Sequence, residues 1–237
     1  MLGQNAVASD EAMLLLRSVA EQLKLPLTTI ARQAELSQLV GDASVVDARS
    51  IHTHAQAALT LVDSYLLGLQ LANGAQALEL EPVSVSSMLV DVAHELDAFA
   101  EQHGVRLSLH IAGKYEPVMA HRQGLRAALL SLGFALLENY PLGQNALTLA
   151  VHRTPHGIVT GLYGIYESVS ADQWRRALEL VGRAAQPMTT LTAGSGAGLF
   201  VAEAIMRSME TRLRVGKYRK QQGLAATLLP SQQLQFV

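Results

Sequence analysis

The sequence predicts an α+β protein, in which an antiparallel helical hairpin precedes an α/β sandwich. Apolar residues recur every three or four positions in two long N-terminal segments, which is the spacing of amphipathic helices. Beyond Leu78, alternating strand-like and helix-like segments indicate one sheet with helices on one face. Hydrophobic residues make up 49% of the 237 residues and charged residues 16%, as in a globular protein. We expect a hairpin domain over residues 1–76 and a sandwich domain over residues 77–237.

The first predicted helix has a proline near its middle. Ser9 is a good N-cap residue, and Gly41 ends the periodic segment. An interior proline normally kinks or ends a helix, because it removes a backbone donor and clashes with the preceding turn. The apolar seam nevertheless continues past Pro26. It comprises Leu16, Val19, Leu23, Leu27, Ile30 and Ala34.

The second predicted helix begins near Asp47 and ends at Asn73-Gly74. A lone hairpin would expose a long apolar seam, so we expect two copies to form a four-helix bundle. In the alternative, both helices pack on the C-terminal domain of a monomer. The apolar stripe expected on this helix is Ile51, Ala55, Ala58, Val62, Tyr65 or Leu66, and Leu69.

The second half of the chain has the element pattern of an α/β sandwich. Alternating apolar residues predict strands, and longer periodic runs predict helices. Ser86 or Ser87 is the expected cap of the first helix of this half. Expected strands cover residues 81–85, 105–111, 146–151, 158–163, 213–218 and 224–229, and expected helices cover residues 87–102, 121–139, 172–181 and 198–209.

Composition excludes several classes of function. A net charge of −2 gives no reason to expect binding to nucleic acid or to an anionic membrane, and there are no cysteines for disulfides or thiolate metal sites. The longest apolar runs are shorter than the ~20 residues of a membrane span, and the N-terminus lacks the pattern of a secretory signal. His152 and His156 have no carboxylate at a spacing typical of a metal site. We expect a cytoplasmic protein.

Two parts of the chain resemble sensor histidine kinases. Leu23-Lys24-Leu25-Pro26-Leu27 is similar to the H-box pattern Ser-His-Glu-Leu-Arg-x-Pro-Leu. The second half resembles the ATP-binding domain of the GHKL class, through 80–83 (Leu-Glu-Pro-Val), 101–105 (Glu-Gln-His-Gly-Val) and the closing Gly223 to Pro230. The resemblance implies a phospho-accepting histidine five positions before Pro26. Glu21 occupies that position.

The resemblance also implies a nucleotide site, most of which has decayed. Gly194-Ser195-Gly196-Ala197-Gly198-Leu199 resembles the glycine-rich phosphate loop, whose glycines allow close backbone approach. Asn139 fits the second of two asparagines that hold Mg²⁺ and phosphate in the family, but the first falls on Ala135. We expect Asn139, Gly194, Ser195, Gly196 and Gly198 to be vestigial.

The adenine-reading motif of the family, Asp-x-Gly-x-Gly, falls on residues 164–168. Gly164 replaces the aspartate that accepts the adenine amino group, and Tyr166 and Ser168 replace the glycines. Leaving such a buried donor unpaired costs about 1–3 kcal/mol. No aspartate lies within residues 157–169, so a shift of the alignment does not restore it.

These losses favour a non-catalytic histidine-kinase-like protein without ATP or Mg²⁺. It would bind a response-regulator receiver domain or a histidine kinase and modulate a two-component pathway. We considered three alternatives: a phosphotransferase that uses His52 or His54, a divergent ATP-dependent kinase, and a purely structural dimer. The expected docking surface comprises Glu21, Gln22, Lys24, Leu25, Thr28 and Thr29.

Overall fold

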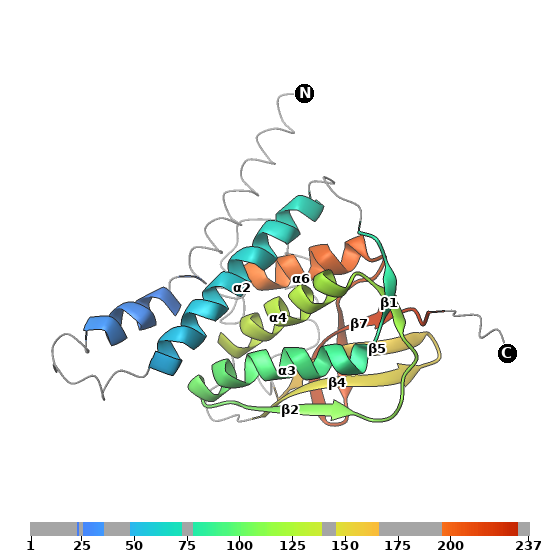
Figure 1. Cartoon of the computed structure of the whole chain (residues 1–237). Coiled ribbons are helices and arrows are strands. Elements are labelled where there is room, and N and C mark those ends of the chain that lie inside the picture. The colour runs from blue at the N-terminus through green and yellow to red at the C-terminus, as the bar shows by residue number, and fades with distance from the viewer. Residues whose placement is uncertain are drawn as a thin grey trace.

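The computed structural model of the chain describes residues 23, 26–35, 48–72, 78–138, 146–165 and 196–231. The order of its elements confirms the predicted α+β class, since helices come first and a mixed sheet with further helices follows (Figure 1). Leu23 and residues 26–35 are helical, in agreement with a helix on both sides of Pro26. The next element is the long helix α2 (Ala48–Ala72).

A five-stranded sheet in the order β2-β4-β5-β7-β6 forms the base of the sandwich. β2 and β4 are parallel, and the other neighbouring strands are antiparallel. A separate two-stranded sheet joins β1 (Glu81–Val83) to β3 (Val118–Ala120), a strand that the sequence did not predict. The five strands are β2 (Arg106–Ile111), β4 (Ala146–Thr154), β5 (Gly157–Gly164), β6 (Arg214–Tyr218) and β7 (Gln221–Leu228).

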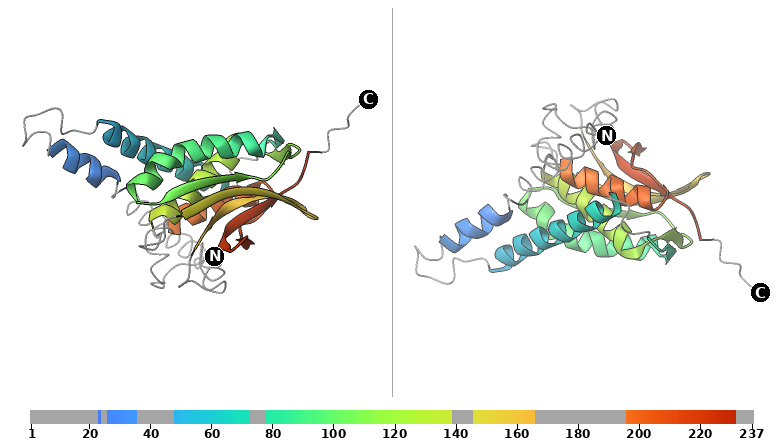
Figure 2. Two further views of the ribbon diagram at one scale, coloured as in Figure 1. Left: turned by 90° about the horizontal axis from the view of Figure 1, so that it is seen from below. Right: turned by 90° about the horizontal axis from the view of Figure 1, so that it is seen from above.

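The described helices cover one face of this sheet. α3 (Val85–Gln102), α4 (Arg122–Glu138) and α6 (Gly196–Ser208) form the layer (Figure 2). Residues 128–137 of α4 are all buried, which agrees with the long apolar run seen there in the sequence. The core therefore lies between α4 and the sheet, where Leu129, Leu149 and Leu162 are fully buried.

α2 packs on this helical layer instead of standing apart from it. Its side chains Leu61 and Tyr65 belong to the same hydrophobic core as the residues of α4 and α6. Gly68 faces Val201 of α6 so closely that a Cβ atom there would lie 3.1 Å from a Val201 methyl group. One face of the second hairpin helix is thus part of the core of the sandwich.

Two local predictions were wrong in detail. The N-cap of α3 is Ser84, whose hydroxyl accepts a hydrogen bond from the Ser87 amide, whereas Ser86 or Ser87 was expected. On α2, the expected stripe had Tyr65 or Leu66 at one position, and of these two Tyr65 is buried and Leu66 exposed; Val62, also expected in the stripe, is exposed. The α2 face that is buried comprises His54, Ala57, Ala58, Leu61, Ser64, Tyr65, Gly68 and Leu71. The predicted helix 172–181 and the small-residue loop after it lie outside the described residues.

Candidate functional site

The expected docking helix is described only in part. Glu21, Gln22, Lys24 and Leu25 lie outside the described residues. Thr28 is exposed and Thr29 is half-buried, so at least this turn of the predicted surface reaches solvent.

Pro26 and Leu27 are neighbours on one helix but differ in burial. Pro26 is buried, while Leu27 is 54% exposed and lies next to the exposed Thr28. A buried proline ring contributes apolar surface without a backbone donor that would need a partner. This arrangement supports a packing role for Pro26 and leaves Leu27 available as an apolar contact.

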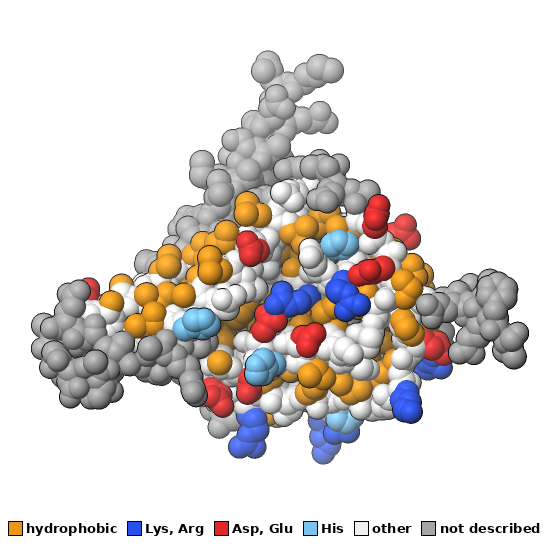
Figure 3. Space-filling model, viewed as in Figure 1, with side chains coloured by type: hydrophobic (Ala, Val, Ile, Leu, Met, Phe, Trp, Pro, Cys, Tyr) orange, Lys and Arg blue, Asp and Glu red, His pale blue; other side chains and the backbone are white. Residues whose placement is uncertain are grey.

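α2 has a second apolar face, which is exposed in the described part of the chain. We call Leu59, Val62 and Leu66 the outer stripe of α2. They follow one another at steps of three and four residues, and their exposed fractions are 59%, 37% and 54%. Figure 3 shows the hydrophobic side chains gathered along this helix. A helix that is apolar on two faces is typical of a helix covered on both sides.

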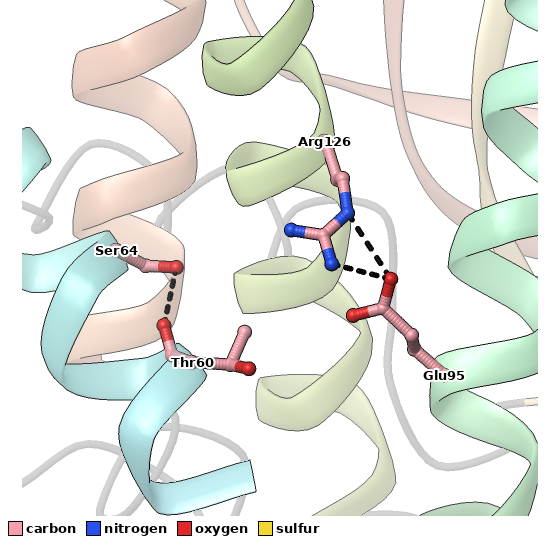
Figure 4. Close-up of polar contacts among 4 residues, drawn as sticks. All are labelled: Thr60, Ser64, Glu95 and Arg126. Carbon is pink, nitrogen blue, oxygen red and sulfur yellow. Dashed lines mark hydrogen bonds and ion pairs between the residues drawn. The ribbon is translucent and has the colours of Figure 1, made fainter. Parts of the chain in front are cut away.

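The buried Ser64 on the inner face of α2 has a hydrogen-bond partner within the helix. Ser64 is 3% exposed, and its hydroxyl donates a hydrogen bond of 2.7 Å to the Thr60 carbonyl one turn earlier (Figure 4). Such a bond within the helix lets a serine lie in an apolar contact without an unpaired hydroxyl. The inner face therefore behaves as core.

The two candidate acceptor histidines of α2 differ in accessibility. His52 is exposed, whereas His54 is 6% exposed and lies on the inner face. A phosphoryl donor must approach the imidazole in line, so a buried ring is a poor acceptor. Of the two residues, His52 alone has the exposure that phosphotransfer requires.

The residue that the resemblance assigns to the first family asparagine is a core residue. Ala135 of α4 is fully buried and belongs to the main hydrophobic core. Its methyl side chain offers no oxygen, and Mg²⁺ requires oxygen ligands. Asn139 lies outside the described residues. The described part of this site does not fit a magnesium ion.

Gly164, which the resemblance assigns to adenine reading, is the last residue of β5. Gly164 is buried and pairs with Leu147 of β4 and with Gln222 of β7. None of the strands β2, β4, β5, β6 and β7 contains an aspartate or a glutamate. No carboxylate on the sheet therefore replaces the missing aspartate. The arrangement does not fit the usual recognition of adenine.

The glycine-rich loop runs into α6. Gly196 is the first residue of that helix and Gly198 is buried within it, whereas Gly194 and Ser195 lie outside the described residues. Leu199, which follows, is 2% exposed and belongs to the main core. Gly198 is thus part of a packed helix start.

A ring cluster on the sheet face away from the helices was missed in the sequence. The Tyr218 ring lies 5.4 Å from His110, 5.3 Å from His152 and 5.3 Å from Tyr163, measured between ring centroids. Burial lowers the pKa of His152 and, together with Tyr218, raises the pKa of Tyr163. No sequence pattern indicates this cluster, because its four residues come from four different strands and have no regular spacing. Within the described residues, no group of three His, Asp or Glu side chains is placed to hold a metal ion.

Comparison with known proteins supports the fold. No protein-family model matches the sequence, and no curated protein matches it. Full-length ShkA, solved with AMPPNP, has a TM-score of 0.55 at 17% identity, and the match covers 96% of this chain and 46% of ShkA. The Acinetobacter baumannii histidine kinase AdeS has a TM-score of 0.51 at 13% identity, covering 90% of this chain and 98% of AdeS.

A third solved structure has a similar fold. A bacterial phosphotransferase has a TM-score of 0.50 at 15% identity, covering 92% of this chain and 96% of that protein. The chain spans less than half the length of ShkA. Its fold is similar to the folds of these solved structures, with N-terminal helices followed by a mixed α/β sandwich. None of the described helices is both long and apolar enough to cross a membrane.

Proposed function

We propose that this chain is a non-catalytic, histidine-kinase-like signalling protein of a two-component pathway. The observation that carries the proposal is Ala135, a fully buried methyl side chain in a kinase-like fold at the position of a metal-binding asparagine. Glu21 at the acceptor position and Gly164 at the adenine position support it further. A protein with these changes would act by binding another protein and not by transferring phosphate.

The proposed partner is a response-regulator receiver domain or a histidine kinase, docked on the first hairpin helix. Docking between helices depends on surface shape and apolar anchors, so it does not need the missing histidine. The exposed Leu27 and Thr28 support such a surface. Glu21, Gln22, Lys24 and Leu25 complete it in the proposal, with Thr29 at its edge.

The outer stripe of α2 supports self-association. Because the inner face of α2 packs on α4 and α6, a second copy of the chain would cover Leu59, Val62 and Leu66. In this proposal the hairpins of two chains form the four-helix bundle, and each sandwich stays packed on its own α2. Residues 1–76 then act as a dimerisation unit and residues 77–237 as its support.

Calorimetric titration with ATP and Mg²⁺ tests the absence of nucleotide chemistry. A ligand that binds the folded state raises the melting temperature when it is present in excess of its Kd. We expect no heat of binding and no such thermal shift. A Kd tighter than about 1 mM would contradict the proposal and favour a divergent kinase. AMPPNP serves as a second, non-hydrolysable probe.

Transfer from a radiolabelled, phosphorylated receiver domain tests the phosphotransferase alternative. The variant His52→Gln removes the exposed acceptor, and His156→Gln removes an exposed histidine of the β4–β5 turn as a matched control. We expect the receiver domain to bind and no label to reach the wild-type chain. Label that reaches wild type and the control, and is lost in His52→Gln, would establish the phosphotransferase instead.

One observation favours nucleotide binding as a second candidate function. The Gln222 Oε1 atom is buried and has no hydrogen-bond partner among the described residues, and Gln222 is the register partner of Gly164. An unpaired buried oxygen is an acceptor for which a ligand amino group would be a partner. Under this candidate, Gln222→Leu abolishes an ATP binding signal that the wild-type chain gives.

A further inference from the structure

Five exposed cationic side chains gather on the edge strand β6 and the residues that flank it. We call Arg212, Arg214, Lys217, Arg219 and Lys220 the basic edge. All are exposed, and the segment 212–220 contains no aspartate or glutamate. The strands of the five-stranded sheet also lack both residue types. Lysine and arginine side chains project from the lower side of the molecule in Figure 3, where the sheet lies.

The basic edge has no anionic partner within the described part of the chain. Four other arginines pair with a glutamate at N–O distances of 2.5–3.4 Å, among them Arg126 with Glu95 (Figure 4). No residue of the basic edge is in such a pair. The Arg219 guanidinium instead donates to the His110 Nε2 atom at 2.7 Å. Clustered like charges repel each other, so an external anion would relieve this repulsion.

β6 also presents a free backbone edge. It is the last strand of the sheet, and its residues Arg214–Tyr218 pair with β7 alone among the described strands. A strand edge with unpaired backbone groups is a template for another strand. Its positive charges repel a second copy of β6 or any other basic strand, whereas an acidic strand would gain both backbone hydrogen bonds and charge pairing.

The cations lie on both faces of the sheet. Val215 packs against the core on the helical side, and Lys217 shares that side because successive side chains alternate along a strand. Arg214 lies on the opposite face, together with Tyr218. Acidic residues of an added strand would therefore meet a cation on either face.

We propose that the basic edge binds an extended acidic segment of a partner protein, which adds to the sheet as a strand beside β6. Such strand addition obtains affinity from main-chain hydrogen bonds and specificity from the alternating side chains. The surface is separate from the hairpin, so this proposal is independent of the proposed function.

The ring cluster argues against a nucleic acid on the same face. Single-stranded nucleic acids stack their bases on free aromatic rings. Tyr163 is 1% exposed, and the Tyr218 hydroxyl is hydrogen-bonded to the His110 Nδ1 atom. Tyr163 is therefore not available for base stacking, and the half-buried Tyr218 ring already contacts three neighbouring rings.

The test measures binding of a fluorescein-labelled peptide of about ten residues that alternates glutamate and threonine. Polarisation is recorded with the full chain at about 0.05 M and about 0.3 M salt. Arg214→Glu combined with Lys217→Glu is the test variant. Arg106→Glu combined with Lys114→Glu makes the same change of charge at exposed residues outside the basic edge, and neither of these residues is in an ion pair of the described part.

We expect the wild-type chain and the control variant to bind the peptide and the test variant to bind it at least about tenfold more weakly. Hydrogen exchange at residues 214–218 should slow when the peptide binds, because the outer backbone groups become paired. An equally charged peptide with prolines in alternate positions should bind more weakly, because proline cannot donate to the ladder.

Several results would overturn the proposal. Equal binding of the proline peptide, or equal loss in the control variant, would mean diffuse charge attraction without strand addition. Tighter binding of an oligothymidylate or of anionic vesicles than of the peptide would assign the edge to a nucleic acid or to a membrane surface. No binding of the peptide at low salt would leave the basic edge as a solvated strand edge.

Discussion

Leu61 and Leu66 of α2 point to opposite sides of the helix. The side chain of Leu61 is 1% exposed and lies in the core with α4 and α6, whereas that of Leu66 is 54% exposed on the outer stripe. The two residues are chemically identical and lie on one helix, so their variants compare the two faces directly.

We expect Leu61→Ala to lower the free energy of unfolding by about 2–5 kcal/mol, because it leaves a cavity in the core. Leu66→Ala should change it by less than about 0.5 kcal/mol in the monomer, because its side chain is exposed. Urea unfolding at low protein concentration measures both. Analytical ultracentrifugation should show weaker self-association for Leu66→Ala. Unchanged association in that variant would contradict the dimer through the outer stripe.

Glu203 joins α6 to the start of β6. Its carboxylate is buried and accepts hydrogen bonds from Arg207 Nε at 2.7 Å and from the Leu213 amide at 2.8 Å. We expect Glu203→Ala to destabilise the fold by about 2–3 kcal/mol, because it leaves the Leu213 amide unpaired. Arg207→Ala removes the half-exposed partner and should cost less, about 1 kcal/mol. Equal losses in urea unfolding would contradict this account.

The half-buried His152 predicts a pH dependence of stability. Burial lowers its pKa in the folded state below the ordinary histidine value of about 6.5, so in this range the unfolded chain binds more protons than the folded protein. The free energy of unfolding therefore decreases as the pH falls through 6.5 toward the folded-state pKa. His152→Gln should flatten this decrease in urea unfolding measured between about pH 5 and about pH 7.5. The exposed His156→Gln is the control and should leave the slope unchanged.

Gly133 lets α4 approach α3 closely. A Cβ atom at this position would lie 2.4 Å from a methyl group of Leu96, which is fully buried. We expect Gly133→Ala to destabilise the fold by about 1–3 kcal/mol despite the better helix propensity of alanine. Leu96→Ala makes room for the new methyl group, so the double variant should be more stable than the sum of the two single changes predicts. Additive effects would show that the contact relaxes elsewhere.

The sequence predicted the sandwich well because its segments carry clear apolar runs. The strands β4 and β5 and the helix α4 were predicted within three residues of their observed ends, since their apolar runs are bounded by turns. The short strand β3 was missed, because three residues carry too little periodicity. On α2, periodicity could not choose between two apolar faces, so the predicted stripe mixed buried Tyr65 with exposed Val62.

The candidate site was predicted by resemblance, and the structure adds what resemblance cannot give. Resemblance placed Ala135 and Gly164, but their burial follows from the packing of α4 and from the pairing of β5. The difference between His52 and His54 depends on which side of α2 meets α6, which no spacing reveals. The net charge of −2 likewise concealed the basic edge, because acidic residues on helices and loops balance it.

α2 contributes one face to the core of the sandwich and carries the outer stripe on another face. If α2 rotates or slides when the hairpin binds a partner, Leu61 must leave its place in the core and Gly68 its contact with Val201. The free energy of that repacking then couples partner binding at the hairpin to the stability of the sandwich, and such coupling is reciprocal. A partner that favours one position of α2 would tighten or loosen the sandwich, and a change that loosens the sandwich would alter the affinity of the hairpin by the same factor.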